Sequence, residues 1–458
     1  MLSSSSHLPE GRLRGRKGVF RHPAQVVAFA FAVAILIGTL LLMLPVSRSG
    51  SDAASFPTAL FTSTSAVCVT GLVVVDTPSY WSGFGEAVIL ALIQVGGFGI
   101  MTLASLLGIL VTRRMGLRTR LTAAAETKAI GLGDVRSVVI GVVKVSLIFE
   151  AATALILTLR FALGYDEPIG RATYLGVFHA VSAFNNAGFA LYSDSLTQFV
   201  EDPWICLPIA LAVIAGGIGF PVLFELRKEL RRPGHWSLHT KMTVTTTAAL
   251  LLFGTAFVTA SEWHNAGTLG PLSVPGRFLA GFFHAVMPRT AGFNAIDYGQ
   301  MNEGTLLGTN VLMFIGGGSA GTAGGIKVTT FVLLLFVILA EVRGQHRVNA
   351  FDRQIDDRAT RQALTVALLS VAAVMGATLV LAQLTSHATH EVLFEVTSAF
   401  ATVGLSTGIT AELPVAGQML LVGLMFLGRV GPITLVSALA LRERQLMYEL
   451  PEGRPIIG

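Results

Sequence analysis

Long apolar stretches alternate with short charged ones along the whole chain. Stretches with few or no charges cover residues 25–44, 87–112, 137–159, 203–224, 242–261, 304–340, 362–386 and 413–441. A helix rises about 1.5 Å per residue, so each stretch is long enough to cross about 30 Å of hydrocarbon. The pattern predicts eight membrane-spanning helices.

A shorter apolar segment lies between the two spans of each successive pair. These segments cover residues 56–66, 172–184, 276–288 and 390–400. A segment of roughly 10–14 residues is too short to span and is typical of a re-entrant helix, which enters and leaves on the same side. The predicted unit is therefore span, half-helix, loop, span.

Each half-helix ends at a copy of one glycine motif. The copies read SAVCVTGL at 65–72, SAFNNAGF at 182–189, VMPRTAGF at 286–293 and SAFATVGL at 398–405. Their glycines recur about every 110 residues, which indicates four repeats arranged pseudo-symmetrically around one central pore. We expect repeats at 25–112, 113–230, 231–345 (with a broken second span) and 346–445, between a basic N-terminal segment 1–24 and a C-terminal tail 446–458.

The composition agrees with a membrane location. Hydrophobic residues make up 52% and charged residues only 13% of the 458 residues, against about 25% charge in a soluble domain. The fold class expected is all-α integral membrane. The first apolar stretch has no small-residue cleavage site, so we interpret it as a retained helix and not as a signal peptide.

Lysine and arginine residues cluster before the first span, at 113–136, 227–241 and 343–361, and after 441. The positive-inside rule then predicts a multi-pass protein of the cell membrane with both termini and all three inter-repeat loops in the cytoplasm. The glycine motifs would lie on the outer side. Nucleic-acid binding is the weaker interpretation of these clusters, because they lie where juxtamembrane anchors belong.

The motifs carry the candidate chemistry. Irregular backbone at membrane depth is tolerated where it lines a watery cavity, and rings of backbone carbonyls can replace the hydration shell of a monovalent cation. Glycine permits the backbone angles that this requires, and the C-terminal ends of the half-helices favour cations. The candidate filter residues are Cys68, Val69, Thr70, Gly71, Asn185, Asn186, Ala187, Gly188, Arg289, Thr290, Ala291, Gly292, Ala401, Thr402, Val403 and Gly404.

One such glycine alone would be explained best as a helix C-cap. Fourfold recurrence after a non-spanning helix favours the filter. A second glycine set begins at Gly96, Gly216, Gly316 and Gly428. Close helix packing explains most of this second set.

Two members of the second set depart from the pattern. In the third repeat, glycines dominate residues 316–325, and each costs about 1 kcal/mol in a helix, so the span should break there. In the fourth repeat Arg429 replaces a glycine, and a charge inside the membrane is usually functional. The candidate gate is Gly316, Gly317, Gly318, Ser319, Ala320, Gly321, Thr322, Ala323, Gly324, Gly325, Lys327 and Arg429; Lys327 equally fits a lysine reaching the inner surface.

Several motifs of other protein classes occur by chance. Ser319 lies in G-x-S-x-G, but no strand precedes it to form a nucleophile elbow, so an intramembrane serine hydrolase is a remote alternative. Ile326 breaks the phosphate-loop pattern. His179 and His284 have different spacings from the motif glycine and fit core residues better than metal ligands. We expect no catalytic residue and no covalent cofactor.

The four motifs, the stretch GGGSAG at 316–321 and the segment GRVGP at 428–432 resemble the Trk/Ktr/HKT superfamily of potassium transporters. The resemblance covers nearly the whole chain. Eight spans without an extra N-terminal pair are most similar to the membrane subunit of bacterial Ktr systems. The resemblance identifies 316–325 as an intramembrane gating loop and Arg429 as its pore-facing arginine.

The same resemblance implies the ion and the partners. It implies potassium uptake by a homodimer with one pore per protomer, regulated by a cytosolic KtrA-like ring of RCK subunits that carries the nucleotide, ATP/ADP or NAD(H). Gly71 favours potassium, since a serine there accompanies sodium selectivity in some members. Sodium-dependent uptake and an HKT-like sodium-selective or potassium/sodium cotransporter remain open. An alternating-access transporter normally shows inverted repeats, whereas these four run in one orientation.

Overall fold

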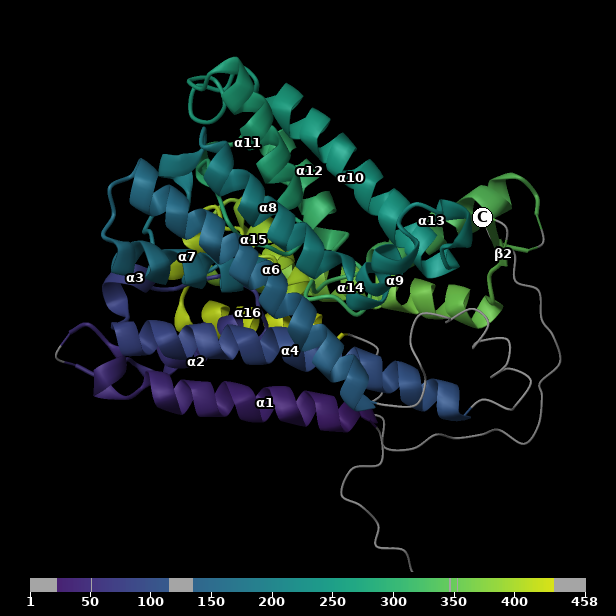
Figure 1. The fold of residues 1–458 in the computed structure, drawn as a ribbon, viewed down its shortest axis with the longest axis horizontal. Coiled ribbons are helices and arrows are strands. Elements are labelled where there is room, and N and C mark those ends of the chain that lie inside the picture. The colour runs from purple at the N-terminus through teal and green to yellow at the C-terminus, as the bar shows by residue number, and fades with distance from the viewer. Residues whose placement is uncertain (1–22, 51, 115–134, 346, 352, 432–458) are drawn as a thin grey trace, which may run out of the picture.

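A computed structural model describes residues 23–50, 52–114, 135–345, 347–351 and 353–431 (Figure 1). The predicted N-terminal segment 1–24 lies almost wholly outside these residues. Most of the first inter-repeat loop, the last part of the stretch 413–441 and the C-terminal tail also lie outside them. The described chain is almost entirely helical. A two-stranded hairpin between β1 (Asn349–Ala350) and β2 (Arg353–Gln354) is a small departure from the all-α expectation.

Each predicted repeat contains three or four α-helices of the structure. The first predicted repeat contains α1 (Pro23–Leu42), half-helix α2 (Phe56–Val67), a short α3 (Thr77–Tyr80) and α4 (Gly83–Arg114). The second contains α6 (Val135–Gly164), half-helix α7 (Ile169–Phe184), α8 (Pro203–Ile218) and α9 (Phe220–Glu229). The third contains α10 (Leu238–Glu262), half-helix α11 (Val274–Val286), α12 (Glu303–Phe314) and α13 (Val328–Val342). The fourth contains α14 (Asp357–Leu384), half-helix α15 (Thr389–Ala401) and α16 (Val415–Val430).

Local sequence accounts for where two half-helices begin. Ser55 and Ser273 are N-caps whose hydroxyl oxygens accept from the backbone N–H of Thr58 and Gly276. A proline stands two residues after each serine, inside the first turn, where its missing N–H costs nothing.

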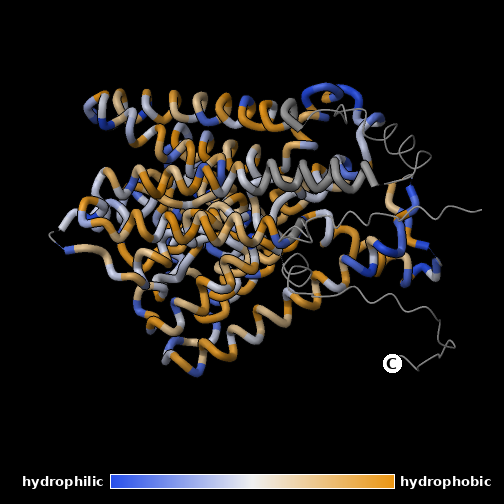
Figure 2. The backbone as a smooth tube through the Cα atoms, turned by 90° about the horizontal axis from the view of Figure 1, so that it is seen from below, coloured by the Kyte–Doolittle hydropathy of each residue, from blue (hydrophilic) through white to orange (hydrophobic). Residues whose placement is uncertain are grey.

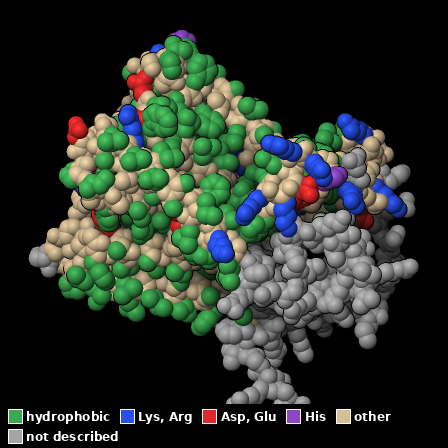
Figure 3. Space-filling view, in the orientation of Figure 1, with side chains coloured by type: hydrophobic (Ala, Val, Ile, Leu, Met, Phe, Trp, Pro, Cys, Tyr) green, Lys and Arg blue, Asp and Glu red, His purple; other side chains and the backbone are tan. Residues whose placement is uncertain are grey.

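The length and composition of the helices indicate a multi-pass membrane protein. Within the described residues, four helices are long and apolar enough to cross a membrane: Gln25–Leu42, Val139–Gly164, Leu238–Glu262 and Asp357–Leu384. The pair α8 and α9 makes a fifth if it is taken as one span. Large apolar side chains such as Ile148, Leu155 and Leu163 are exposed on α6. In Figure 2 hydrophobic residues occur along most of the length of the helices. In Figure 3 hydrophobic side chains cover most of the visible surface of the helices.

The breaks in the spans are partly as expected. The predicted break in the third repeat is confirmed, because α12 ends at Phe314 and α13 begins only at Val328. The expectation of one continuous span over 203–224 is wrong. The chain bends by 102° between α8 and α9. Gly219 at the bend has a φ of 98° and Pro221 follows it, so the backbone hydrogen bonds of the helix cannot continue through this point.

The repeats close into a ring. α4 packs against α6 and α7, α8 against α11, α12 against α15, and α16 against α2, so that the fourth repeat returns to the first. In Figure 1 the yellow-green α15 and α16 lie between the purple helices of the first repeat and the teal helices of the third. The last residues of the four half-helices, Val67, Phe184, Val286 and Ala401, are all buried in one apolar cluster.

Candidate functional site

The four motif glycines lie against one another in a closed ring. A β-carbon built on Gly71 would lie 3.1 Å from the Cα of Gly188, and one on Gly188 would lie 2.8 Å from the Cα of Gly292. The corresponding distances are 3.2 Å from Gly292 to Gly404 and 3.0 Å from Gly404 back to Gly71. Each of these β-carbons would also meet the carbonyl oxygen that precedes the neighbouring glycine. No side chain fits at these four positions.

The backbone around each glycine takes the same unusual path. The glycines have φ values of 96°, 72°, 72° and 93°, and the residue two before each is also left-handed: Val69 at 55°, Asn186 at 60°, Thr290 at 67° and Thr402 at 52°. Left-handed angles at residues other than glycine are strained, and they persist where the surroundings enforce them. Four separate segments have therefore been folded to one conformation.

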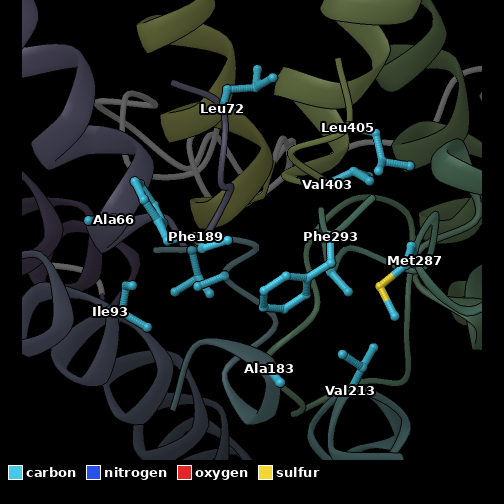
Figure 4. Packing of buried hydrophobic residues seen from close by; sticks show 14 of the residues in the cluster. Ala66, Leu72, Ile93, Ala183, Phe189, Val213, Met287, Phe293, Val403 and Leu405 are labelled. Carbon is cyan, nitrogen blue, oxygen red and sulfur yellow. The ribbon is translucent and has the colours of Figure 1, made fainter. Parts of the chain in front are cut away.

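The residue after each glycine anchors the ring in the core. Leu72, Phe189, Phe293 and Leu405 are each at most 1% exposed. Figure 4 shows these four side chains within the buried apolar cluster that surrounds the motifs. The other positions of the first motif, Cys68, Val69 and Thr70, are also buried, and Cys68 is the C-cap of α2.

Serines at the start of the motif hold three of the loops. Ser65 and Ser398 accept from the backbone N–H of Gly71 and Gly404, each at 3.0 Å, and Ser182 donates to the carbonyl of Phe189 at 2.8 Å. The sequence interpretation did not assign them a role. The signal was present, because a serine opens the first, second and fourth copies, whereas the third begins with Val286.

Asn185 is backed by a buried polar cluster. Its side-chain amide nitrogen donates to Gln94 at 2.8 Å and to Glu150 at 3.2 Å, and Gln94 donates to the same carboxylate at 3.0 Å. Glu150 is 6% exposed. The Glu150 carboxylate on α6 therefore lies against residues from α4 and from the end of α7.

The Arg289 side chain extends toward α10 and the start of the stretch 316–325. Its guanidinium donates to the hydroxyl of Thr247 and to the carbonyl of Gly316, each at 3.4 Å. The side chain is buried. Arg289 therefore reaches from the third motif to the start of the glycine-rich stretch.

The stretch 316–325 forms a loop below the ring and docks on two other repeats. Its backbone N–H groups at Gly318 and Thr322 donate to the carbonyls of Gly217 and Gly216, at 2.7 and 3.1 Å. A β-carbon on Gly324 would meet Thr402 and the carbonyl of Ala401, and one on Gly325 would meet Ala401. The loop thus lies between the broken second repeat and the end of half-helix α15.

Charged side chains hold the loop from the fourth repeat and from its own end. Arg429 donates to the carbonyl of Thr322 within the loop and to the carbonyl of Gly96 on α4, the latter at 3.0 Å. Lys327 donates to the carbonyls of Ala323 and Gly324. Thr322 in turn contacts the Asn186 side-chain amide at 2.8 Å, so the loop touches the second motif directly.

The second glycine set permits close packing, as expected for most of its members. A β-carbon on Gly96, Gly216 or Gly428 would collide with the carbonyl of Val67, Phe184 or Phe400 respectively. Each of those carbonyls lies at the end of the half-helix of the same repeat. These glycines set the distance between span and half-helix.

The alternatives from the sequence find no support in the geometry. The Ser319 hydroxyl pairs with Thr329 at 3.0 Å. His179 and His284 are core residues, as expected. Cys68 and Cys206 are both free and buried. Among the described residues, no group of three or more histidine, cysteine, aspartate or glutamate side chains is placed to hold a metal.

Comparisons with known proteins identify the class. The family model for TrkH cation transport proteins matches residues 14–448, and the chain belongs to this family of membrane transport proteins, not to an enzyme family. The chain is 42% identical to the Ktr system potassium uptake protein B of Bacillus subtilis (strain 168), over 95% of this chain and 97% of that protein. It is 34% identical to the potassium/sodium uptake protein NtpJ of Enterococcus hirae, over 95% and 97%.

A solved structure shares the fold. The crystal structure of the potassium transporter TrkH from Vibrio parahaemolyticus superposes with a TM-score of 0.73 at 17% identity and covers 93% of this chain and 87% of that one. The family match and the relatives confirm the resemblance stated from the motifs, and this structure agrees with it in fold.

Proposed function

We propose that this chain is the membrane subunit of a potassium uptake system and that it conducts K⁺ through the ring formed by the four motifs. The closed contact of four glycines with positive φ is the observation that carries the proposal. Alternating left-handed residues let successive carbonyls face one axis, where they substitute for water around a monovalent cation. Names of relatives that include potassium uptake support the choice of ion.

The arrangement in the membrane follows from the repeats. Four repeats, 25–112, 113–230, 231–345 and 346–445, would supply eight spans and four re-entrant pore helices. The filter would be residues 68–71, 185–188, 289–292 and 401–404. Lysine and arginine side chains gather at the end of the molecule that carries α9, α13 and β2 (Figure 3), which supports a cytoplasmic location for that end.

The gate would be the loop 316–325. It lies below the ring, it is held by Arg429 and Lys327 through carbonyl hydrogen bonds, and it touches Asn186. A loop held by a few hydrogen bonds can adopt two arrangements and so admit or block an ion. Regulation would come from a cytosolic KtrA-like nucleotide-binding ring on the cytoplasmic face of a homodimer. The word system in the name of a relative supports a partner subunit.

Uptake of potassium and sodium in a bacterial strain without potassium uptake of its own tests this function. Wild-type chain should restore potassium uptake. Gly71→Ser adds a β-carbon against the Ala187 carbonyl and should lower the preference for potassium over sodium. Shortening 316–325 should raise flux.

Gly423→Ser is the matched control, because a β-carbon at this exposed position of α16 meets nothing within 4 Å. Unchanged ion preference in Gly71→Ser, together with unchanged flux in the shortened loop, would contradict the filter and the gate. Sodium uptake that exceeds potassium uptake in the wild type would favour a sodium-transporting relative of the NtpJ kind.

A further inference from the structure

In three of the four repeats, a buried side chain on the half-helix accepts a hydrogen bond. The donor is the backbone N–H of the third residue after the motif glycine. His179 accepts from Leu191 at 3.3 Å, His284 from Ala295 at 3.2 Å and Glu395 from Thr407 at 2.9 Å. All three acceptors are at most 1% exposed. Each bond therefore joins the half-helix before the motif to the chain leaving it.

Both histidines use the same ring nitrogen. Nε2 of each histidine faces a backbone N–H, so Nε2 carries no proton and Nδ1 is the donor. Nδ1 of His179 lies 2.8 Å from the carbonyl of Leu175, and Nδ1 of His284 lies 2.8 Å from the hydroxyl of Tyr298. One partner on the second nitrogen fixes the tautomer and the orientation of the ring.

Glu395 does the same work with a carboxylate. It also accepts from the hydroxyl of Ser406 at 2.6 Å and from that of Thr410 at 2.7 Å. Donor groups from three residues surround this fully buried acid, and all three residues follow the fourth motif. In the fourth repeat the chain after the motif is thus fixed to the half-helix by several hydrogen bonds to this side chain, whereas in the second and third repeats the histidine accepts one from that backbone.

The unequal sequence spacing of the two histidines has a structural cause. The residue before each motif glycine donates its backbone N–H to a carbonyl earlier in the motif. In the first, second and fourth repeats that carbonyl belongs to the residue five positions earlier. In the third repeat it belongs to the residue four positions earlier, because Ala291 donates to Met287. Counted from that carbonyl, His179, His284 and Glu395 all stand three residues earlier. The turn of the third repeat is therefore one residue shorter, and the acceptor side chain has the same position relative to that carbonyl as in the second and fourth repeats.

The first repeat lacks this bond. The equivalent residue is Thr62, which stands three residues before Ser65. Its hydroxyl is buried and has no hydrogen-bond partner among the described residues. The chain therefore contains its own internal comparison for the role of the acceptor.

We infer that His179, His284 and Glu395 are positioning residues. Each fixes the conformation of one of three filter segments by joining the half-helix before it to the chain after it. Carbonyls that face an ion are not free to bond to protein, so the segments cannot be stiffened by a regular backbone ladder. The acceptors close each loop at its outer side and limit how far the ring can widen. This inference rests on the proposed function and adds residues that do not touch the ion.

Replacing the acceptor tests this role through ion preference. His179→Leu and His284→Leu remove the acceptor and leave a buried N–H unsatisfied. Glutamine keeps an acceptor oxygen near the place of Nε2. The ratio of potassium to sodium uptake should fall roughly five-fold or more in the leucine variants, given the cost of an unsatisfied buried donor, and should stay within about two-fold of wild type in the glutamine variants.

The ratio separates positioning from folding, because loss of folded protein lowers both fluxes and leaves their ratio unchanged. Thr62→Val is the matched control and should keep the wild-type ratio. If a leucine variant does not reach the membrane, the asparagine variant decides in its place, since its shorter amide ends before the backbone N–H.

Two outcomes would overturn the inference. One is a wild-type ratio in leucine or asparagine variants that reach the membrane. The other is an equal loss in the glutamine and leucine variants, which would assign the effect to ring packing. Failure of the proposed function is a different result, since wild-type protein would then restore no potassium uptake at all.

Discussion

The ring of glycines and the layer directly below it are built in opposite ways. At the ring, four segments of different sequence share one backbone conformation, with positive φ at Gly71, Gly188, Gly292 and Gly404. Below it, four segments with similar glycines diverge: α4 continues, α8 bends into α9, α12 ends in a loop, and α16 carries Arg429.

The difference teaches what each layer needs. Surrounding a cation with carbonyls requires equal geometry from all sides. Blocking a path requires one element that can move while the others hold it. In the proposed function the loop 316–325 is that element, and its partners Gly216, Gly217, Thr402 and Arg429 come from other repeats. Equality at one level and inequality at the next is therefore consistent with a filter above a gate.

The sharpest way to break the equal layer is Gly188→Ala. Its β-carbon would lie 2.8 Å from the Cα of Gly292, and a left-handed alanine costs roughly 1–2 kcal/mol before any collision. Potassium uptake should fall at least about ten-fold, a change that corresponds to 1.4 kcal/mol.

Gly376→Ala on α14 is the control, since nothing lies within 4 Å of its added carbon. Uptake by Gly188→Ala close to that of the control would show that the ring tolerates a side chain, and the comparison of the two layers would fail.

The unequal layer is tested by Arg429→Gln. The variant loses the guanidinium bonds to the carbonyls of Thr322 and Gly96, and bonds to charged groups contribute about 1.5–3 kcal/mol each. A freed loop should raise potassium flux several-fold while the ratio of potassium to sodium uptake stays at the wild-type value.

Arg358→Gln removes a positive charge from the exposed first turn of α14 and should leave the flux unchanged. A changed ion ratio in Arg429→Gln would place its role at the ring and not at the loop.

The smallest effect is expected at the outer rim, where Glu201 joins the second repeat to the third. Its carboxylate accepts from the backbone N–H of Ser273 at 2.9 Å and from the Ser273 hydroxyl. These bonds lower the pKa of Glu201 below its ordinary value of 4.5. A lowered pKa stabilises the folded state above pH 4.5, and the contribution is lost as the pH falls through the folded value.

Glu201→Gln should therefore melt slightly below wild type at pH 7, by about 1 °C because solvent screens an exposed group, and the gap should shrink as the pH falls below 4.5. Ser273→Ala should cause a similar loss, and the double variant should not add to it. A gap that is constant with pH would contradict the assigned carboxylate bond.

Much of the fold was predictable because it is local. Apolar length predicted where the half-helices end, and α2, α7, α11 and α15 have nearly the predicted bounds. The cluster of glycines at 316–325 predicted the broken third span, since glycine is a poor helix former. The bend after Gly219 was missed because Gly216 and Gly217 do pack within the helix, and the break depends on the proline that follows.

The parts of the site that were not predictable depend on contacts between distant segments. Glu150 carries no sequence sign that it backs Asn185, 35 residues away. The two histidines seemed unrelated by spacing, because the shorter turn of the third repeat is visible only in its backbone hydrogen bonds.

The sequence by itself determined the membrane class, the half-helices, the fourfold motif and the place of the broken span. Each of these follows from apolar length, charge or glycine content within one segment, and so depends only on residues that are close together in the sequence. Only the tertiary structure decided that the four glycines touch in a ring, that Arg429 holds the loop, and that His179, His284 and Glu395 accept equivalent backbone N–H groups. Those contacts join residues from different helices or across a turn, and their geometry is set by how the repeats pack together.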